Sequence, residues 1–90
     1  MMTVRAADDL LVTEFGDELV ILNLKDGVYY GLAGVGAHVW ALVKEPVGID
    51  AICDEIAARF DVDRAECERD IRALVDDLAS NGLVEVSTAS

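Results

Sequence analysis

The sequence predicts a small α+β domain of winged helix-turn-helix type. Between residues 10 and 32 the apolar residues fall into three short runs separated by turn residues, which is typical of an antiparallel sheet. After residue 34 they recur at helical spacing in three further segments. Ninety residues are one domain's worth of chain. We therefore expect a single domain over residues 1–90, with its core between about 8 and 86.

Three strands are expected first. "LLVTEF" from residue 10 and "LVILNL" from residue 19 are rich in strand-forming residues and are separated by a turn at 16–18. Gly27 ends the next connection and can take the positive φ that a short hairpin loop requires. The third strand is Val28 to Leu32, so residues 10–32 should form a three-stranded antiparallel sheet.

Three helices are expected next, at about 34–44, 49–60 and 64–80. Pro46 and Gly48 separate the first two. Asp63 stands three residues before Glu66, as in a capping box that begins the third helix. Gly82 suits the left-handed position after its end. Leu83 to Val86 then form either a short terminal strand or an extended tail, and residues 87–90 should be frayed.

The charge excludes several classes of partner. The formal net charge is −11 at pH 7, whereas nucleic acids and anionic membranes are bound mainly through Lys and Arg. Residues 63–77 of the third helix hold six acids and three arginines, which would repel DNA phosphates. No apolar run reaches about 18 residues and the N-terminus lacks the features of a signal peptide. We expect a cytoplasmic protein with no nucleic-acid or membrane partner.

Catalytic chemistry is missing from the pattern. His38 is the only histidine, and we interpret it as a partly exposed polar residue of the first helix. Cys53 and Cys67 lie on apolar helical stripes, as buried thiols do, and show no zinc-ligand spacing. The glycines at 31, 34 and 36 lack the GxGxxG spacing of a dinucleotide loop. We therefore expect no enzyme activity, no cofactor and no metal.

The third strand is the feature that suggests a function. In a meander it lies at the edge of the sheet, and Val28 to Leu32 contain neither lysine nor proline, the residues that usually protect an edge. Tyr29 and Tyr30 must point to opposite faces. Either both serve packing, or the edge accepts a peptide as an additional strand.

Three sequence patterns favour peptide binding at this edge. Together they resemble the patterns of the PqqD-like family, whose members are also called RiPP precursor recognition elements. They are "DGVYYGL", "GAHVW" and "ERDIRALVDDLASNGLV", which occur in that order within about residues 19–84. None of them is catalytic. As a free-standing domain, the chain resembles most the leader-peptide-binding proteins of lasso-peptide biosynthesis.

The resemblance implies a site and partners. The leader of a ribosomally made precursor would add as an antiparallel strand to residues Val28, Tyr29, Tyr30, Gly31 and Leu32. The third helix would wall the groove, for which we choose the flank of Asp70, Ala73, Leu74 and Asp77, although the sequence does not fix which flank faces it. The bound precursor would be presented to a separate leader peptidase and then to a cyclase.

Two other functions stay open at this stage. One is a PqqD-like peptide chaperone of another RiPP or quinone-cofactor pathway. The other is an acidic winged-helix regulator that binds protein or DNA.

Overall fold

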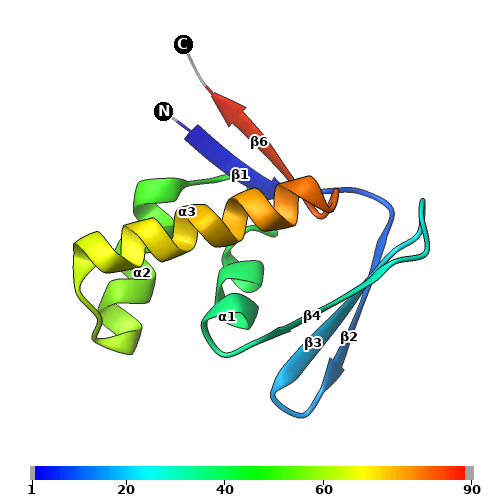
Figure 1. Cartoon of the computed structure of the whole chain (residues 1–90), viewed down its shortest axis with the longest axis horizontal. Helices are drawn as coiled ribbons and strands as arrows, with labels where there is room; N and C mark the ends of the chain where they lie inside the picture. The colour runs from blue at the N-terminus through cyan, green and yellow to red at the C-terminus, as the bar shows by residue number, and fades with distance from the viewer. Residues whose placement is uncertain (1, 89–90) are drawn as a thin grey trace.

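The computed structural model describes residues 2–88, which form two small sheets and three helices (Figure 1). In chain order the elements are β1 (Met2–Ala6), β2 (Leu10–Phe15), β3 (Glu18–Asn23), β4 (Tyr29–Ala33), α1 (Val35–Leu42), β5 (Val47–Gly48), α2 (Ile49–Phe60), α3 (Arg64–Ser80) and β6 (Val84–Thr88). The predicted α+β class is confirmed.

The first sheet joins the two ends of the chain. Its order is β5-β1-β6, and β1 pairs antiparallel with β6 from Met2↔Thr88 to Ala6↔Val84. β1 was not predicted from the sequence, and the residues of β5 were expected to form part of a turn. The terminal segment is a strand, as one of the two alternatives held, and Ser87 and Thr88 belong to it rather than to a frayed end. Residues 89 and 90 lie outside the described residues.

The second sheet is the predicted meander. Its order is β2-β3-β4, all antiparallel, and it extends away from the helices (Figure 1). The third strand is displaced by one residue from the prediction, covering 29–33 instead of 28–32. Gly27 has a φ of +72°, as the hairpin connection was expected to require.

The helices follow the prediction closely because their ends carry recognisable signals. The bounds of α2 and α3 are those predicted. The Asp63 carboxylate accepts a hydrogen bond from the Glu66 N–H at 3.1 Å, which confirms the cap of α3. Gly82 has a φ of +74°, the left-handed conformation expected after that helix. α1 covers 35–42 instead of the predicted 34–44, because Gly34, with a φ of +57°, only caps its start and Val43 caps its end.

The core draws on both sheets and all three helices. Ile21 and Leu32 enter it from the second sheet, and Val4 enters it from β1 with no exposed surface. The core therefore includes a residue before position 8, where the sequence analysis placed its start. Cys53 and Cys67 are buried free thiols, as expected. No helix within residues 2–88 is long and apolar enough to cross a membrane.

The pairing of the chain ends can be tested through Val4 and its partner in register, Val86. Val4→Ala should lower the free energy of unfolding by roughly 2 kcal/mol, because it removes two buried methyl groups and leaves a cavity. Val86→Ala should cost distinctly less, because Val86 is 38% exposed. Denaturant unfolding followed by Trp40 fluorescence measures both. Equal losses would contradict the packing of β1 into the core.

Candidate functional site: the free edge of β4

β4 forms one edge of the second sheet. β3 pairs with it on one side, and the terminal strand β6 pairs with β1 in the other sheet. No strand among residues 2–88 therefore covers the far side of β4.

The register shows which backbone groups face that open side. Residues along an antiparallel strand alternate between bonding to the neighbour and pointing away from it. The Asn23 N–H donates to the Val28 carbonyl at 3.0 Å, so the next bonded positions of β4 are Tyr30, opposite Ile21, and Leu32. The N–H and C=O groups of Tyr29, Gly31 and Ala33 consequently point outward. They present a row of donors and acceptors over three alternate residues.

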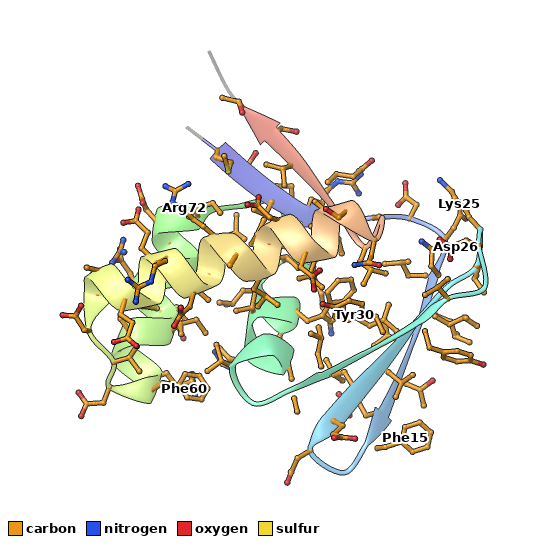
Figure 2. The ribbon with its side chains drawn as sticks, viewed as in Figure 1. Phe15, Lys25, Asp26, Tyr30, Phe60 and Arg72 are labelled. Carbon is orange, nitrogen blue, oxygen red and sulfur yellow. The ribbon has the colours of Figure 1, made fainter. Side chains whose placement is uncertain are left out.

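The side chains of β4 alternate in the same way. Tyr30 packs against the core and Leu32 is only 7% exposed, whereas Tyr29 is 69% exposed on the opposite face of the sheet. The two tyrosines therefore point to opposite faces, as predicted. Tyr30 is directed toward α3 (Figure 2).

The structure places part of the flank chosen in the sequence analysis near β4 and the start of α1. The Tyr30 hydroxyl donates a hydrogen bond to the Asp77 carboxylate, which places Asp77 on the β4 side of the helix. Asp70, two helical turns earlier, lines a cavity together with Val35, the residue that begins α1 just after β4. Ala73 and Leu74 lie between these two positions, and Leu74 is partly buried against the core.

That cavity has an apolar floor and an acidic rim. Its volume is about 190 Å³. Ile56, Cys67 and Ile71 supply buried apolar atoms, while Asp63, Glu66 and Asp70 border its mouth. A site of this kind suits an apolar side chain whose neighbour carries a positive charge.

Ion pairing leaves the β4 side of α3 acidic. Arg64 pairs with Asp54 at 3.0 Å and Arg72 pairs with Glu68 at 3.2 Å. Arg72 and Tyr30 lie on opposite sides of α3 (Figure 2). Among the described residues, none of the ion pairs includes Glu66, Asp70 or Asp77. The carboxylates of Glu66, Asp70 and Asp77 therefore have no ion-pair partner among the described residues, and neither has the neighbouring Arg69.

Asn23 is a positioning residue that the sequence analysis missed. It is 6% exposed, its Nδ2 donates to the Asn81 carbonyl at 3.3 Å, and its Oδ1 accepts from the Lys25 N–H at 3.0 Å. It thus connects the β3–β4 turn to the end of α3. The only signal in the sequence was a polar residue near the end of an otherwise apolar strand.

The Asp77 contact and burial both raise the pKa of the Tyr30 hydroxyl. The hydrogen bond to Asp77 raises the pKa of the Tyr30 hydroxyl, and burial and the nearby negative charge raise this pKa further. The folded protein therefore holds this proton more tightly than the unfolded chain does. The link contributes stability that is present below about pH 10 and is lost as the pH rises through the raised pKa.

His38 is the other side chain that the sequence offered for chemistry. His38 is partly exposed, as predicted, but it has neighbours that were not anticipated: its Nε2 lies 3.9 Å from the Glu55 carboxylate, and its ring meets Phe60 edge-on. The Nε2 atom has no hydrogen-bond partner among the described residues. Within residues 2–88 no group of three or more His, Cys, Asp or Glu side chains could hold a metal ion.

The fold and the edge together define a small α+β domain in which one strand edge is left open near a helix. The family model described as coenzyme PQQ synthesis protein D (PqqD) matches residues 18–84. The chain therefore belongs to the PqqD family. No curated protein matches the chain significantly.

Solved structures share the fold over nearly the whole chain. TbiB1, solved in complex with the TbiA(beta) leader peptide, is 36% identical with a TM-score of 0.85, and the match covers 96% of this chain and 99% of TbiB1. A lasso peptide synthetase B1, solved with a leader peptide, is 24% identical with a TM-score of 0.81, covering 91% and 96% of the two chains. The lantibiotic dehydratase MibB from Microbispora sp. 107891 is also 24% identical, with a TM-score of 0.65 over 94% of this chain but 8% of MibB. The last two matches concern the fold alone.

The link between β4 and α3 can be tested by titrating Tyr30. In a Tyr29→Phe background, Tyr30 is the only tyrosine, because the chain has two. Asp77→Asn should then lower the pKa of Tyr30 toward its ordinary value, because the carboxylate acceptor and its charge are both removed. Ultraviolet absorbance of the phenolate measures the change. Asp76→Asn removes the same charge one residue away and should leave the pKa where it was; an equal effect of both variants would show that Asp77 has no special contact.

Proposed function

We propose that this protein binds the leader segment of a ribosomally synthesised precursor peptide, of the lasso class, as an antiparallel strand added to β4. The observation that carries the proposal is the row of outward backbone groups at Tyr29, Gly31 and Ala33 on an edge that faces α3. The 36% identity to TbiB1, which was solved with a leader peptide, supports the same reading.

Each part of the expected site has a distinct role in this proposal. Tyr29 and Gly31 bond to the guest backbone, joined by Ala33, which the sequence analysis did not include. The backbone groups of Tyr30 and Leu32 bond to β3 and keep β4 in the sheet. Val28 precedes the strand, and its N–H donates to Asp26 at 3.0 Å, so Val28 contributes apolar surface rather than that donor.

The α3 flank supplies the selectivity. Ordering a disordered peptide costs roughly 2–5 kcal/mol, and each backbone hydrogen bond returns only about 1 kcal/mol, so apolar anchors are required. The cavity between Val35 and Ile71 accepts one such anchor. Ala73 and Leu74 form the apolar wall beside it, while Asp70 and Asp77 attract basic residues of the leader.

The protein itself performs no reaction in this proposal. It presents the bound precursor to a leader peptidase of the same pathway, and the core peptide then passes to a cyclase. The acidic side of α3 gives no support to the alternative of a DNA-binding regulator, because phosphates would be repelled there.

One second candidate has an observation in its favour. The family model over residues 18–84 is that of a coenzyme PQQ synthesis protein, which favours a peptide chaperone of a quinone-cofactor pathway. The two candidates share the binding site and differ in the peptide. Titrating the protein with the leader of the precursor encoded beside its gene, and with the TbiA(beta) leader, tells them apart.

Strand addition predicts different effects of two substitutions at Gly31. A Cβ there would meet no atom within 4 Å, so the Gly31→Ala protein should fold and bind normally. Gly31→Pro removes the outward N–H without touching the bonds to β3 and should weaken leader binding at least about tenfold. Calorimetric titration measures affinity, and circular dichroism confirms that both variants are folded. Equal affinities of the two variants would exclude the pairing.

A role of Asp70 in the groove predicts a charge effect confined to one flank of α3. Asp70→Asn should weaken binding of a leader with basic residues roughly two- to fivefold, since an exposed ion pair contributes up to about 1 kcal/mol. Asp76→Asn makes the same change in net charge and should leave the affinity unaltered. The Asp70 effect should also shrink as salt concentration rises. If both variants lose affinity alike, the attraction arises from the overall charge and not from this flank.

A further inference from the structure

A cavity of about 620 Å³ lies between α1 and the hairpin formed by β2 and β3. Val12 and Glu14 of β2 and Leu19 of β3 line its sheet side, and residues of α1 line its helix side. Phe60 extends from the end of α2 toward α1, where its ring meets that of His38 edge-on, and both residues line the cavity (Figure 2). We call this cavity the wedge. None of its lining residues belongs to the proposed leader site on β4 and α3.

The wedge combines apolar walls with an excess of negative charge. Trp40 and Phe60 supply aromatic surface, and Ala41 leaves room between α1 and the sheet. The Asp, Glu and Lys residues that line it are three acids and one base, and none of them takes part in an ion pair within residues 2–88; they are Glu14, Asp17, Glu18 and Lys44. The chemistry that fits this lining is an apolar or aromatic side chain beside a lysine or arginine.

The wedge also reaches an open strand edge. β2 is an outer strand of its sheet, and β3 is its only partner within residues 2–88. The Leu24 N–H donates to the Asp9 carbonyl at 3.0 Å, so the bonded positions continue at every second residue along β2. The N–H and C=O groups of Val12 and Glu14 therefore point away from β3. Because both residues line the wedge, a chain bound there has backbone groups as well as side chains to bond with.

The direction of the proposed guest strand leads to the wedge. A strand antiparallel to β4 begins beside Ala33 and ends beside Tyr29. Gly34 lines the wedge, while Val35 lines the smaller cavity beside α3, so the two cavities flank the start of α1. A Cβ at Gly34 would meet no atom within 4 Å, which leaves open space at this point of the backbone. Leader residues that precede the paired strand therefore emerge next to the wedge.

We propose that the wedge binds the N-terminal arm of the leader, the residues that precede its paired strand, through an apolar or aromatic side chain adjacent to a lysine or arginine. This inference rests on the proposed function, because the arm is defined by the strand that pairs with β4. It deepens that function by adding a second site with its own selectivity. β4 and α3 hold the strand, whereas α1 and β2 select the arm.

The experiment uses the full chain and a nested set of synthetic peptides, shortened one residue at a time from the N-terminus of the leader encoded beside its gene. The test variant is Ala41→Trp, which places a large side chain in the wedge from an exposed position of α1. The matched control is Ala51→Trp, the same substitution at an exposed position of α2 outside the wedge. Calorimetric titration measures the affinities, and circular dichroism confirms that both variants are folded.

A second measurement does not depend on either variant. A photoreactive benzoylphenylalanine at the N-terminus of the full leader is crosslinked to the wild-type protein, and mass spectrometry identifies the crosslinked residues. Crosslinks should fall within residues 12–19 or 37–44, which line the wedge.

Affinity for the wild type and for Ala51→Trp should fall in two stages along the peptide set. Removing the arm should weaken binding about fivefold or more, and removing strand residues should abolish what remains. Ala41→Trp should bind the full leader only as tightly as the wild type binds the peptide without the arm, so the first stage disappears.

Three results would overturn the binding of the arm in the wedge: an unchanged first stage in folded Ala41→Trp, no first stage in the wild type, or crosslinks confined to other surfaces. So would a wild-type dimer in sedimentation that Ala41→Trp abolishes, because a second copy would then occupy the wedge. Failure of the wild type to bind any peptide of the set would instead refute the proposed function. That outcome is distinguishable because strand addition is read from the second stage and the wedge from the first.

Discussion

The pairing of β1 with β6 is the constraint on which the rest of the structure depends. A terminal strand that follows a long helix can return to either sheet, and here five residues of each chain end satisfy one another's backbone groups. β6 is therefore not available to β4, whose outward N–H and C=O groups remain open at the edge of the other sheet. An open edge is a liability that proteins usually protect. Its retention on a strand without lysine or proline is what makes recognition of an extended peptide physically reasonable.

The spacing between β4 and α3 is set by two polar contacts of different strength. Asn23 is buried and bonded at both ends of its amide, so breaking it would leave unsatisfied groups at a cost of about 1–3 kcal/mol. The hydrogen bond from Tyr30 to Asp77 is exposed and correspondingly weak. The first contact fixes the β3–β4 turn against the end of α3. The second can exchange for contacts with a guest without a large loss of stability.

Ion pairs and unpaired carboxylates occupy different sides of α3. Arg64 and Arg72 are paired with acids of α2 and α3, which consolidates the helical side of the molecule. The flank of α3 that faces β4 keeps Asp70 and Asp77 without basic partners among the described residues, and it borders an apolar cavity. This combination of an apolar cavity with carboxylates is what the proposed binding of a single extended chain requires.

The sequence by itself determined the elements whose signals are local. The helical stripes with Asp63 and Gly82 gave the bounds of α2 and α3, and Gly27 marked the hairpin. The predicted site residues on β4 and α3 came from strand order and from a resemblance, and the structure brings Tyr30 and Asp77 together. Only the tertiary structure decided the rest, because it depends on partners distant in sequence. β1 has no local signal of its own and becomes a strand through β6, whose paired residues lie 78 to 86 positions away. The role of Asn23 and the outward direction of Ala33 likewise follow from long-range register and packing, which no single stretch of sequence contains.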